Sequence, residues 1–181
     1  MTIRSLDVHV ATLPAVPLAV VQSRVSRATV GATVRESCGV VWAFARERML
    51  PAGRNVAVYW DGSIRLEAGV ELNVPFEEGH GVVRSATPAG PTASVTLVGP
   101  YDQLGLAHAA VREWCKAHGH ELAGPNWEIY GHWQAEWNTN PLPDSHRCPL
   151  PARLPLTWRP ALPQGTPSQQ SSAPPAHPRH L

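Results

Sequence analysis

The sequence has no excess of charge of one sign, few cysteines and no long apolar run, and each absence excludes a class of protein. The formal net charge of the 181 residues is +1, and the basic side chains form no stripe. Proteins that hold nucleic acid usually carry such a stripe, because neutralising phosphates supplies much of their affinity. We therefore expect no direct nucleic-acid binding.

The N-terminal segment lacks the features of an export signal or a membrane anchor. Its apolar run, residues 13–21, is interrupted by Pro14 and Pro17 and follows Asp7 and His9. A signal peptide has an unbroken apolar region after a basic start, and a membrane-spanning helix needs about 20 apolar residues. We therefore expect a cytoplasmic protein that does not bind a membrane.

Cysteine is scarce, and its spacing excludes two kinds of stabilising site. The three cysteines, Cys38, Cys115 and Cys148, give neither a disulfide framework nor a Cys-x-x-Cys metal site. In a reducing cytosol they remain thiols, and we expect Cys38 and Cys115 in the core. The sequence also has no phosphate loop, zinc-ligand spacing or Ser-His-Asp order. We expect no cofactor and no metal, in a monomer or a homodimer.

Proline is concentrated at the C-terminal end. Of the 19 prolines, 11 lie in residues 141–181, and the last 17 residues contain almost nothing to bury. Such a segment cannot offset its ordering entropy. We predict one folded domain over residues 1–150 and a Pro-rich disordered tail over residues 151–181. Pro149 and Pro151 cannot donate to a strand ladder, so the segment 144–151 is expected to form an edge strand or none.

An internal repeat organises the predicted domain. Ala52-Gly53-Arg54-Asn55 followed by Tyr59 matches Ala123-Gly124-Pro125-Asn126 followed by Tyr130, at a constant offset of 71 residues. A helical stretch precedes each copy of the motif, and an apolar strand precedes each helix. The repeat therefore predicts two copies of a strand–helix–strand–strand unit.

The apolar spacing assigns the elements of each copy. Val34, Cys38, Val41 and Ala45 are spaced four, three and four residues apart, as one face of a helix requires. The first copy is predicted to contain a strand at 17–23, a helix at 31–48 and strands at 55–60 and 65–74. The second is predicted to contain strands at 82–86, 92–98 and 126–132 and a helix from Asp102 to Gly119. This is an α+β fold: an antiparallel sheet with two helices on one face and a ligand cleft on the other.

The strand at 126–132 carries the candidate site. Side chains alternate between the two faces of a strand, so Trp127 and Ile129 share one face, and Glu128, Tyr130 and His132 share the other. Helices require an apolar sheet face, so we expect Trp127 and Ile129 beneath them. The polar set would then point to the open face.

The matching strand of the first copy adds a second aromatic side chain to this face. Tyr59 corresponds to Tyr130, whereas Ala57 corresponds to Glu128. A groove between the copies would carry one carboxylate beside aromatic rings, and Trp133 and Trp137 follow directly. Such a groove suits a flat or cationic ligand. From the residues alone, a solvated Glu128, solvated tyrosine hydroxyls and a surface His132 are the favoured interpretations.

Three segments resemble a known family. GPYDQL (99–104), AGPNWEIYGHW (123–133) and PAGRNVAVYWDG (51–62) are similar to the GyrI-like small-molecule-binding family, over about residues 16–140. This family also supplies the effector-binding domains of AraC-type and MerR-type regulators. The resemblance implies the duplicated fold and an aromatic cleft with one acidic residue. It places that residue at Glu128 and the aromatic wall at Tyr59, Trp60 and Tyr130.

The resemblance implies three functions. The first is a stand-alone, multidrug-type effector-binding protein for cationic or aromatic small molecules. Glu128 would supply the charge, and the rings of Tyr59, Trp60, Tyr130, Trp133 and Trp137 would stack on the ligand. The second is a hydrolase that opens reactive cyclopropane rings, with Glu128, Tyr130 and His132 as catalytic residues. The third is a gyrase-inhibitor-like protein-interaction module. No helix-turn-helix module is expected on this chain, so direct control of transcription is not expected.

Overall fold

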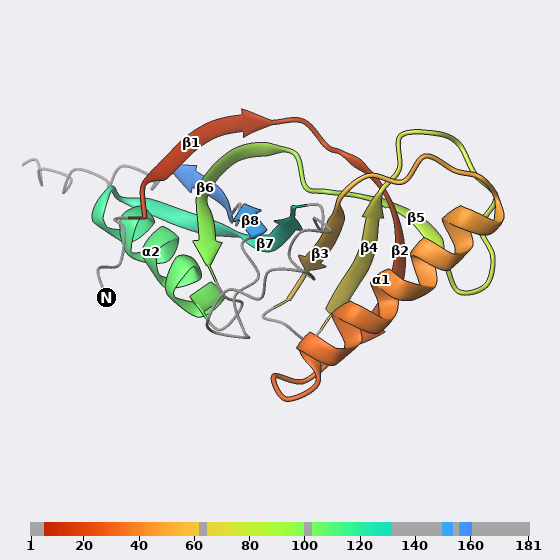
Figure 1. The fold of residues 1–181 in the computed structure, drawn as a ribbon. Helices are drawn as coiled ribbons and strands as arrows, with labels where there is room; N and C mark the ends of the chain where they lie inside the picture. The colour runs from red at the N-terminus through yellow and green to blue at the C-terminus, as the bar shows by residue number, and fades with distance from the viewer. Residues whose placement is uncertain (1–5, 62–64, 100–102, 132–149, 154–155, 161–181) are drawn as a thin grey trace, which may run out of the picture.

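The computed structural model describes residues 6–61, 65–99, 103–131, 150–153 and 156–160. In these ranges, two helices pack against one nine-stranded sheet whose paired strands are antiparallel (Figure 1). The first half comprises β1 (Val8–Leu13), β2 (Pro17–Arg24), α1 (Val30–Glu47), β3 (Asn55–Tyr59) and β4 (Arg65–Glu71). The second comprises β5 (Val83–Ala86), β6 (Gly90–Gly99), α2 (Leu104–Ala117), β7 (His120–Tyr130), β8 (Leu150–Arg153) and β9 (Leu156–Pro160). The predicted α+β fold is confirmed.

The strand order brings the two copies together at the centre of the sheet. The order is β1-β6-β8-β7-β3-β4-β2-β5, and β9 pairs with β6 and β7. β3 and β7 are neighbours, and their register places Ala57 directly opposite Glu128. These two residues are also 71 positions apart, so equivalent points of the two copies face each other. An approximate twofold axis therefore passes beside Glu128.

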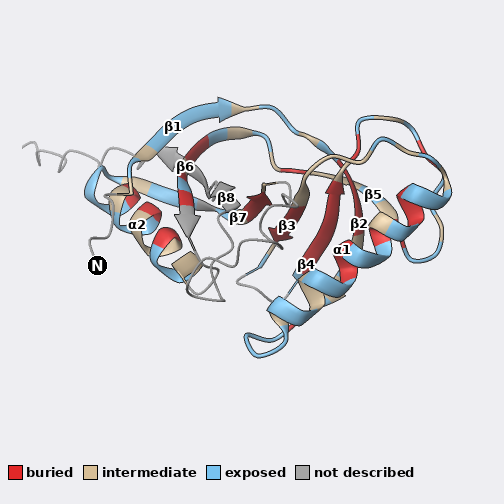
Figure 2. Ribbon diagram, viewed as in Figure 1, coloured by how far each residue is buried: buried red, intermediate tan, exposed pale blue. Residues whose placement is uncertain are grey.

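Each helix covers its own half of the sheet. α1 lies along β2 and β4, and α2 lies along β6 and β7 (Figure 1). Under α1, buried Val41 and Phe44 pack against Ala19 and Val70, and under α2 a second cluster joins Val111 to Val95. The central strands β3 and β4 are buried along most of their length (Figure 2). No helix in the described ranges is long and apolar enough to cross a membrane.

The side of the sheet that holds the polar residues differs from the prediction. Tyr59 and Tyr130 share a cluster with Cys38 of α1, so they lie on the helix side. Trp127 and Ile129 pack on the opposite face, in a cluster with strands β2 and β3. The prediction that the polar set points away from the helices, into a cleft on the helix-free face, is therefore wrong. Both faces of the central strands are buried and apolar, so apolarity could not identify the face that the helices cover.

The sheet continues beyond the predicted domain boundary. The boundary at residue 150 falls within β8, and β9 extends to Pro160. Leu150 and Pro151 belong to β8, which lies between β6 and β7, whereas the rest of the segment expected to form an edge strand or none, residues 144–149, lies outside the described ranges. The ladder of β8 with β7 consists of one residue pair, Ile129 with Arg153, which lies beyond both prolines. In the ladder of β8 with β6, Pro151 is paired with Val98. Residues 161–181 lie outside the described ranges.

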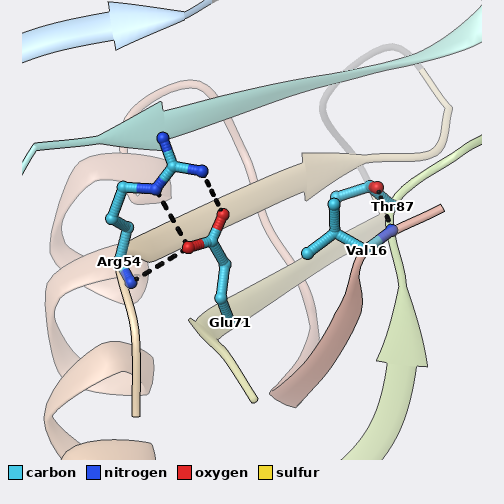
Figure 3. Close-up of polar contacts among 4 residues, drawn as sticks. All are labelled: Val16, Arg54, Glu71 and Thr87. Atoms are coloured by element: carbon cyan, nitrogen blue, oxygen red, sulfur yellow. Dashed lines mark hydrogen bonds and ion pairs between the residues drawn. The ribbon is translucent and has the colours of Figure 1, made fainter. Parts of the chain in front are cut away.

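Polar contacts tie the repeat motifs to the sheet. In the Ala-Gly-Arg-Asn motif, the Arg54 guanidinium donates from Nε to Glu71 Oε2 at 2.9 Å and from Nη2 to Oε1 at 2.6 Å (Figure 3). Val16 N–H donates to Thr87 Oγ1 at 2.9 Å (Figure 3). Thr87 N–H donates in return to the Val16 carbonyl at 3.0 Å. Val16 and Thr87 are 71 positions apart, so equivalent points of the two copies face each other here as well.

The helix ends differ between the copies, and this difference gives a stability prediction. Gly119 follows α2 with φ 69°, whereas Met49 follows α1 with φ 53°. A side chain in this left-handed region costs about 1–2 kcal/mol, which glycine avoids. Met49 is 92% exposed, so its side chain contributes little packing. We expect Met49→Gly to raise the free energy of unfolding by about 0.5–1 kcal/mol after the entropy of the unfolded glycine is included. Urea unfolding measures the change.

The control for this prediction is Met49→Ala, which retains the Cβ atom that causes the strain. We expect its free energy of unfolding to stay close to that of the wild type. Equal stabilisation by glycine and alanine would refute the backbone explanation.

Candidate functional site

A cavity of about 590 Å³ opens between α1 and the central strands on the helix side of the sheet. Its α1 wall comprises Val30, Gly31, Val34, Arg35, Cys38, Gly39 and Trp42. Asn55 and Tyr59 of β3 and Glu128 and Tyr130 of β7 form the strand side, and Leu104 contributes from α2. Its volume lies within the range of about 300–1,000 Å³ typical of small-molecule sites.

Glu128 is the acidic group of this cavity, and it is 4% exposed. Tyr59 Oη donates to its Oε2 atom at 2.9 Å, and Tyr130 Oη donates to the same oxygen. Its other oxygen, Oε1, lies 2.9 Å from Nε2 of His108 on α2. A buried carboxylate is costly unless it is hydrogen-bonded. Three donors therefore hold this charge in a site that largely excludes water.

The strand register explains why the two tyrosines meet at one carboxylate. Tyr130 lies two residues after Glu128 on β7, so both side chains point to the same face. Tyr59 pairs with Asn126, two residues before Glu128, and approaches diagonally from β3. Ala57, directly opposite Glu128, has only a methyl group. The equivalent position of the first copy therefore leaves room for the carboxylate and its partners.

The tyrosine hydroxyls remain protonated donors. Burial raises the pKa of Tyr59, and the negative charge of Glu128 raises it further. The pKa of Tyr130 is raised for the same two reasons, burial first. Ionising either hydroxyl would place a second negative charge beside Glu128 in a poorly solvated site. The site therefore carries one tyrosine-bound carboxylate and not a cluster of anions.

His108 was not identified from the sequence. The apolar stripe of α2 contains Ala107, Val111 and Cys115, with Leu104 packed against the same cluster. His108 fits the same stripe, since it lies four residues after Leu104 and three before Val111. Its spacing reproduces that of Cys38 between Val34 and Val41. A polar residue in an otherwise apolar helix stripe was the available signal.

The α1 wall is shaped by small and polar groups. A Cβ atom at Gly31 or Gly39 would meet nothing within 4 Å, so both glycines leave open space. Trp42 Nε1 donates to Asn55 Oδ1 at 2.7 Å, which fixes an aromatic ring in the wall. Cys38 is buried as predicted, and burial raises the pKa of its thiol to about 11. The thiol is therefore neutral at physiological pH.

The structure brings together three of the predicted site residues, Glu128, Tyr59 and Tyr130. Trp60 is not among the residues lining the cavity; it packs against the cluster on the opposite face, with Val58 and Trp127. His132, Trp133 and Trp137 lie outside the described residues. Among the described residues, no group of three or more His, Cys, Asp or Glu side chains could hold a metal ion.

The fold and the site define a class of protein: a duplicated α+β domain with a helix-walled cavity around one buried carboxylate. The model of the GyrI-like small molecule binding domain matches residues 6–142. The chain therefore belongs to the GyrI-like small-molecule-binding family. No curated protein matches the sequence.

Solved structures share the fold. The crystal structure of the EcmrR C-terminal domain has a TM-score of 0.68 at 15% identity, covering 87% of this chain and 99% of that one. EcmrR in its DNA complex has a TM-score of 0.65 at 16% identity, covering 88% of this chain and 59% of that one. A hydrolase encoded by lin2189 from Listeria innocua has a TM-score of 0.52 at 10% identity, covering 86% and 94%. At these identities the similarity establishes the fold alone.

Proposed function

We propose that this chain is a cytoplasmic effector-binding protein whose cavity takes aromatic cations. The observation that carries the proposal is the buried Glu128 carboxylate, bound by Tyr59 and Tyr130, in a cavity of about 590 Å³. Membership of a small-molecule-binding family supports the use of this cavity for a ligand. The buried free thiols Cys38 and Cys115 are compatible with a reducing compartment.

The chemistry of the cavity favours a positive ligand over a neutral one of the same shape. Aromatic faces attract a cation by about 0.5–2 kcal/mol each. A carboxylate in a site that excludes water interacts more strongly with a charge than it would in solvent. Trp42 and the two tyrosines supply rings, and Glu128 supplies the counter-charge.

Two ligands of equal shape test the proposal. We expect 1-methylquinolinium, a permanent cation, to bind the full-length protein at least tenfold more tightly than the neutral 1-methylnaphthalene at pH 8. Calorimetry and quenching of tryptophan fluorescence measure both affinities. Gly39→Leu should abolish both, because its side chain would project into open cavity space. Equal affinity for the two ligands, or binding unaffected by the leucine, would contradict the proposal.

A second candidate function is hydrolysis of a reactive ligand. The observation that favours it is the pair of Glu128 Oε1 and His108 Nε2 at 2.9 Å, with Tyr130 on the other carboxylate oxygen. Such a set could act as general acid and base, which contributes typically about 10²–10⁴-fold to a rate. Incubation with a strained cyclopropane compound, followed by mass spectrometry, separates the two functions. Recovery of the compound without added water would exclude turnover of that substrate class.

A further inference from the structure

We infer that His108 is a built-in cation of the cavity, which sets the net charge at Glu128 and makes the binding of cationic ligands depend on pH. The inference rests on the proposed function and names a means of regulating the same site. It assigns a role to a residue on α2 that is not among the residues lining the cavity but contacts Glu128, which lines it.

The two oxygens of the Glu128 carboxylate have different hydrogen-bond partners. Oε2 accepts the hydroxyls of Tyr59 and Tyr130, whose ring positions are fixed by the central strands. Oε1 faces only His108 among its described partners, at 2.9 Å. The side chains of His108 and Glu128 are 15% and 6% exposed, so water screens their interaction poorly. The charge of the imidazole therefore acts directly on the carboxylate.

The surrounding groups do not change charge over the same pH range. Burial raises the pKa of Tyr59, Tyr130 and the Cys38 thiol, so all three stay neutral at physiological pH. Arg35, at the α1 rim of the cavity, is exposed and stays positive. Strand β6 packs Ala93, Val95 and Leu97 against α2. Between about pH 5 and pH 8, histidine is the side chain whose charge ordinarily changes.

The two protonation states of His108 give the cavity different ligand preferences. With a neutral imidazole that donates from Nε2, the pair carries one negative charge and attracts a cation. With an imidazolium, the pair is neutral overall and its positive end repels a cation. Affinity for a permanent cation is thus full while the imidazole is neutral and is lost once it is protonated at lower pH. Binding at an intermediate pH must release a proton, because the ligand favours the neutral imidazole.

Calorimetry with 1-methylquinolinium on the full-length protein tests this pH dependence. We expect the affinity of the wild type to fall at least tenfold between pH 8.0 and pH 5.5. At intermediate pH values, the observed enthalpy should depend on the ionisation enthalpy of the buffer, which reports proton release. The neutral 1-methylnaphthalene should show neither effect. His108→Gln keeps an N–H donor and does not titrate, so its affinity for the cation should be equal at both pH values without proton release.

Two results would overturn the inference. One is a wild type whose affinity for the cation does not depend on pH, and the other is a His108→Gln variant whose affinity depends on pH as that of the wild type does. If His108→Gln does not fold, NMR titration of His108 in the wild type decides: saturating cation must lower the pH at which its ring protonates, and an unchanged titration overturns the inference. Equal affinity for the cation and the neutral ligand at pH 8.0 refutes the proposed function instead. A preference for the cation with an unchanged pH profile in the variant refutes only the role of His108.

Discussion

Glu128→Gln is expected to weaken the binding of an aromatic cation about 100-fold at pH 8 while the domain remains folded. Two unit charges about 5 Å apart at an effective dielectric constant of about 20 interact by about 3 kcal/mol, and this energy corresponds to about 100-fold in affinity. Glutamine has the shape of glutamate and retains an acceptor for Tyr59. The loss therefore reports the charge and not the packing. Calorimetry with 1-methylquinolinium measures it.

Glu67 supplies a matched control for this prediction. It is 3% exposed and accepts hydrogen bonds from Gln22 Nε2 at 2.9 Å and from Ser85 Oγ at 2.5 Å. Its neighbours Leu66 and Ala68 belong to the cluster of the helix side, so Glu67 points to the other face of the sheet. Glu67→Gln should affect stability as Glu128→Gln does, yet leave cation binding unchanged. Equal loss of binding in both variants would show that the effect of Glu128 is structural.

The repeat in the sequence predicts which residues of the two central strands lie opposite each other at the site. It does not predict which elements cover them. The offset of 71 residues makes Ala57 and Glu128 equivalent, and the register of β3 with β7 places them opposite each other. Strand alternation correctly groups Glu128 with Tyr130. These relations hold because a strand fixes which side chains share a face, whatever covers that face.

The same reasoning could not decide which face the helices cover. Periodicity distinguishes faces only where one of them is wet, and the central strands are buried on both. Leu66 and Ala68 lie under α1, while Val56 and Val58 fill the opposite cluster. Trp60 extends the second face. Strand alternation therefore does not place it beside Tyr59, and only the resemblance had placed it in the aromatic wall. Pro149 and Pro151 argued against an inner strand, yet Pro151 pairs with Val98 of β6 in β8.

Gly69→Ala is expected to have the largest effect on stability, with a loss of about 3 kcal/mol or more. Gly69 is paired with Val20 of β2 and Val56 of β3 in the centre of the sheet. A Cβ atom at this position would lie 2.0 Å from the Ala19 carbonyl oxygen and 2.8 Å from Val20 Cα. Both atoms belong to the backbone, so no side-chain rotation relieves the clash, and β2 must move away from β4. Overpacking of this kind costs typically about 1–3 kcal/mol, and more where the backbone must shift.

Urea unfolding of Gly69→Ala, compared with Gly39→Ala, tests this explanation. Both variants add one Cβ atom, which meets backbone atoms at position 69 and open space at position 39. At Gly39, within α1, a Cβ atom meets nothing within 4 Å, and alanine is favoured over glycine in a helix by about 1 kcal/mol. Gly39→Ala should therefore stabilise the domain, whereas Gly69→Ala should lower its urea midpoint sharply or prevent folding. Since domains are stable by only about 5–15 kcal/mol, the loss at Gly69 removes a large share of the total. A Gly69→Ala variant with the midpoint of the wild type would mean that β2 and β4 are farther apart than this register allows. The sheet surface on which α1 packs, and with it the cavity wall, would then be less tightly packed than described here.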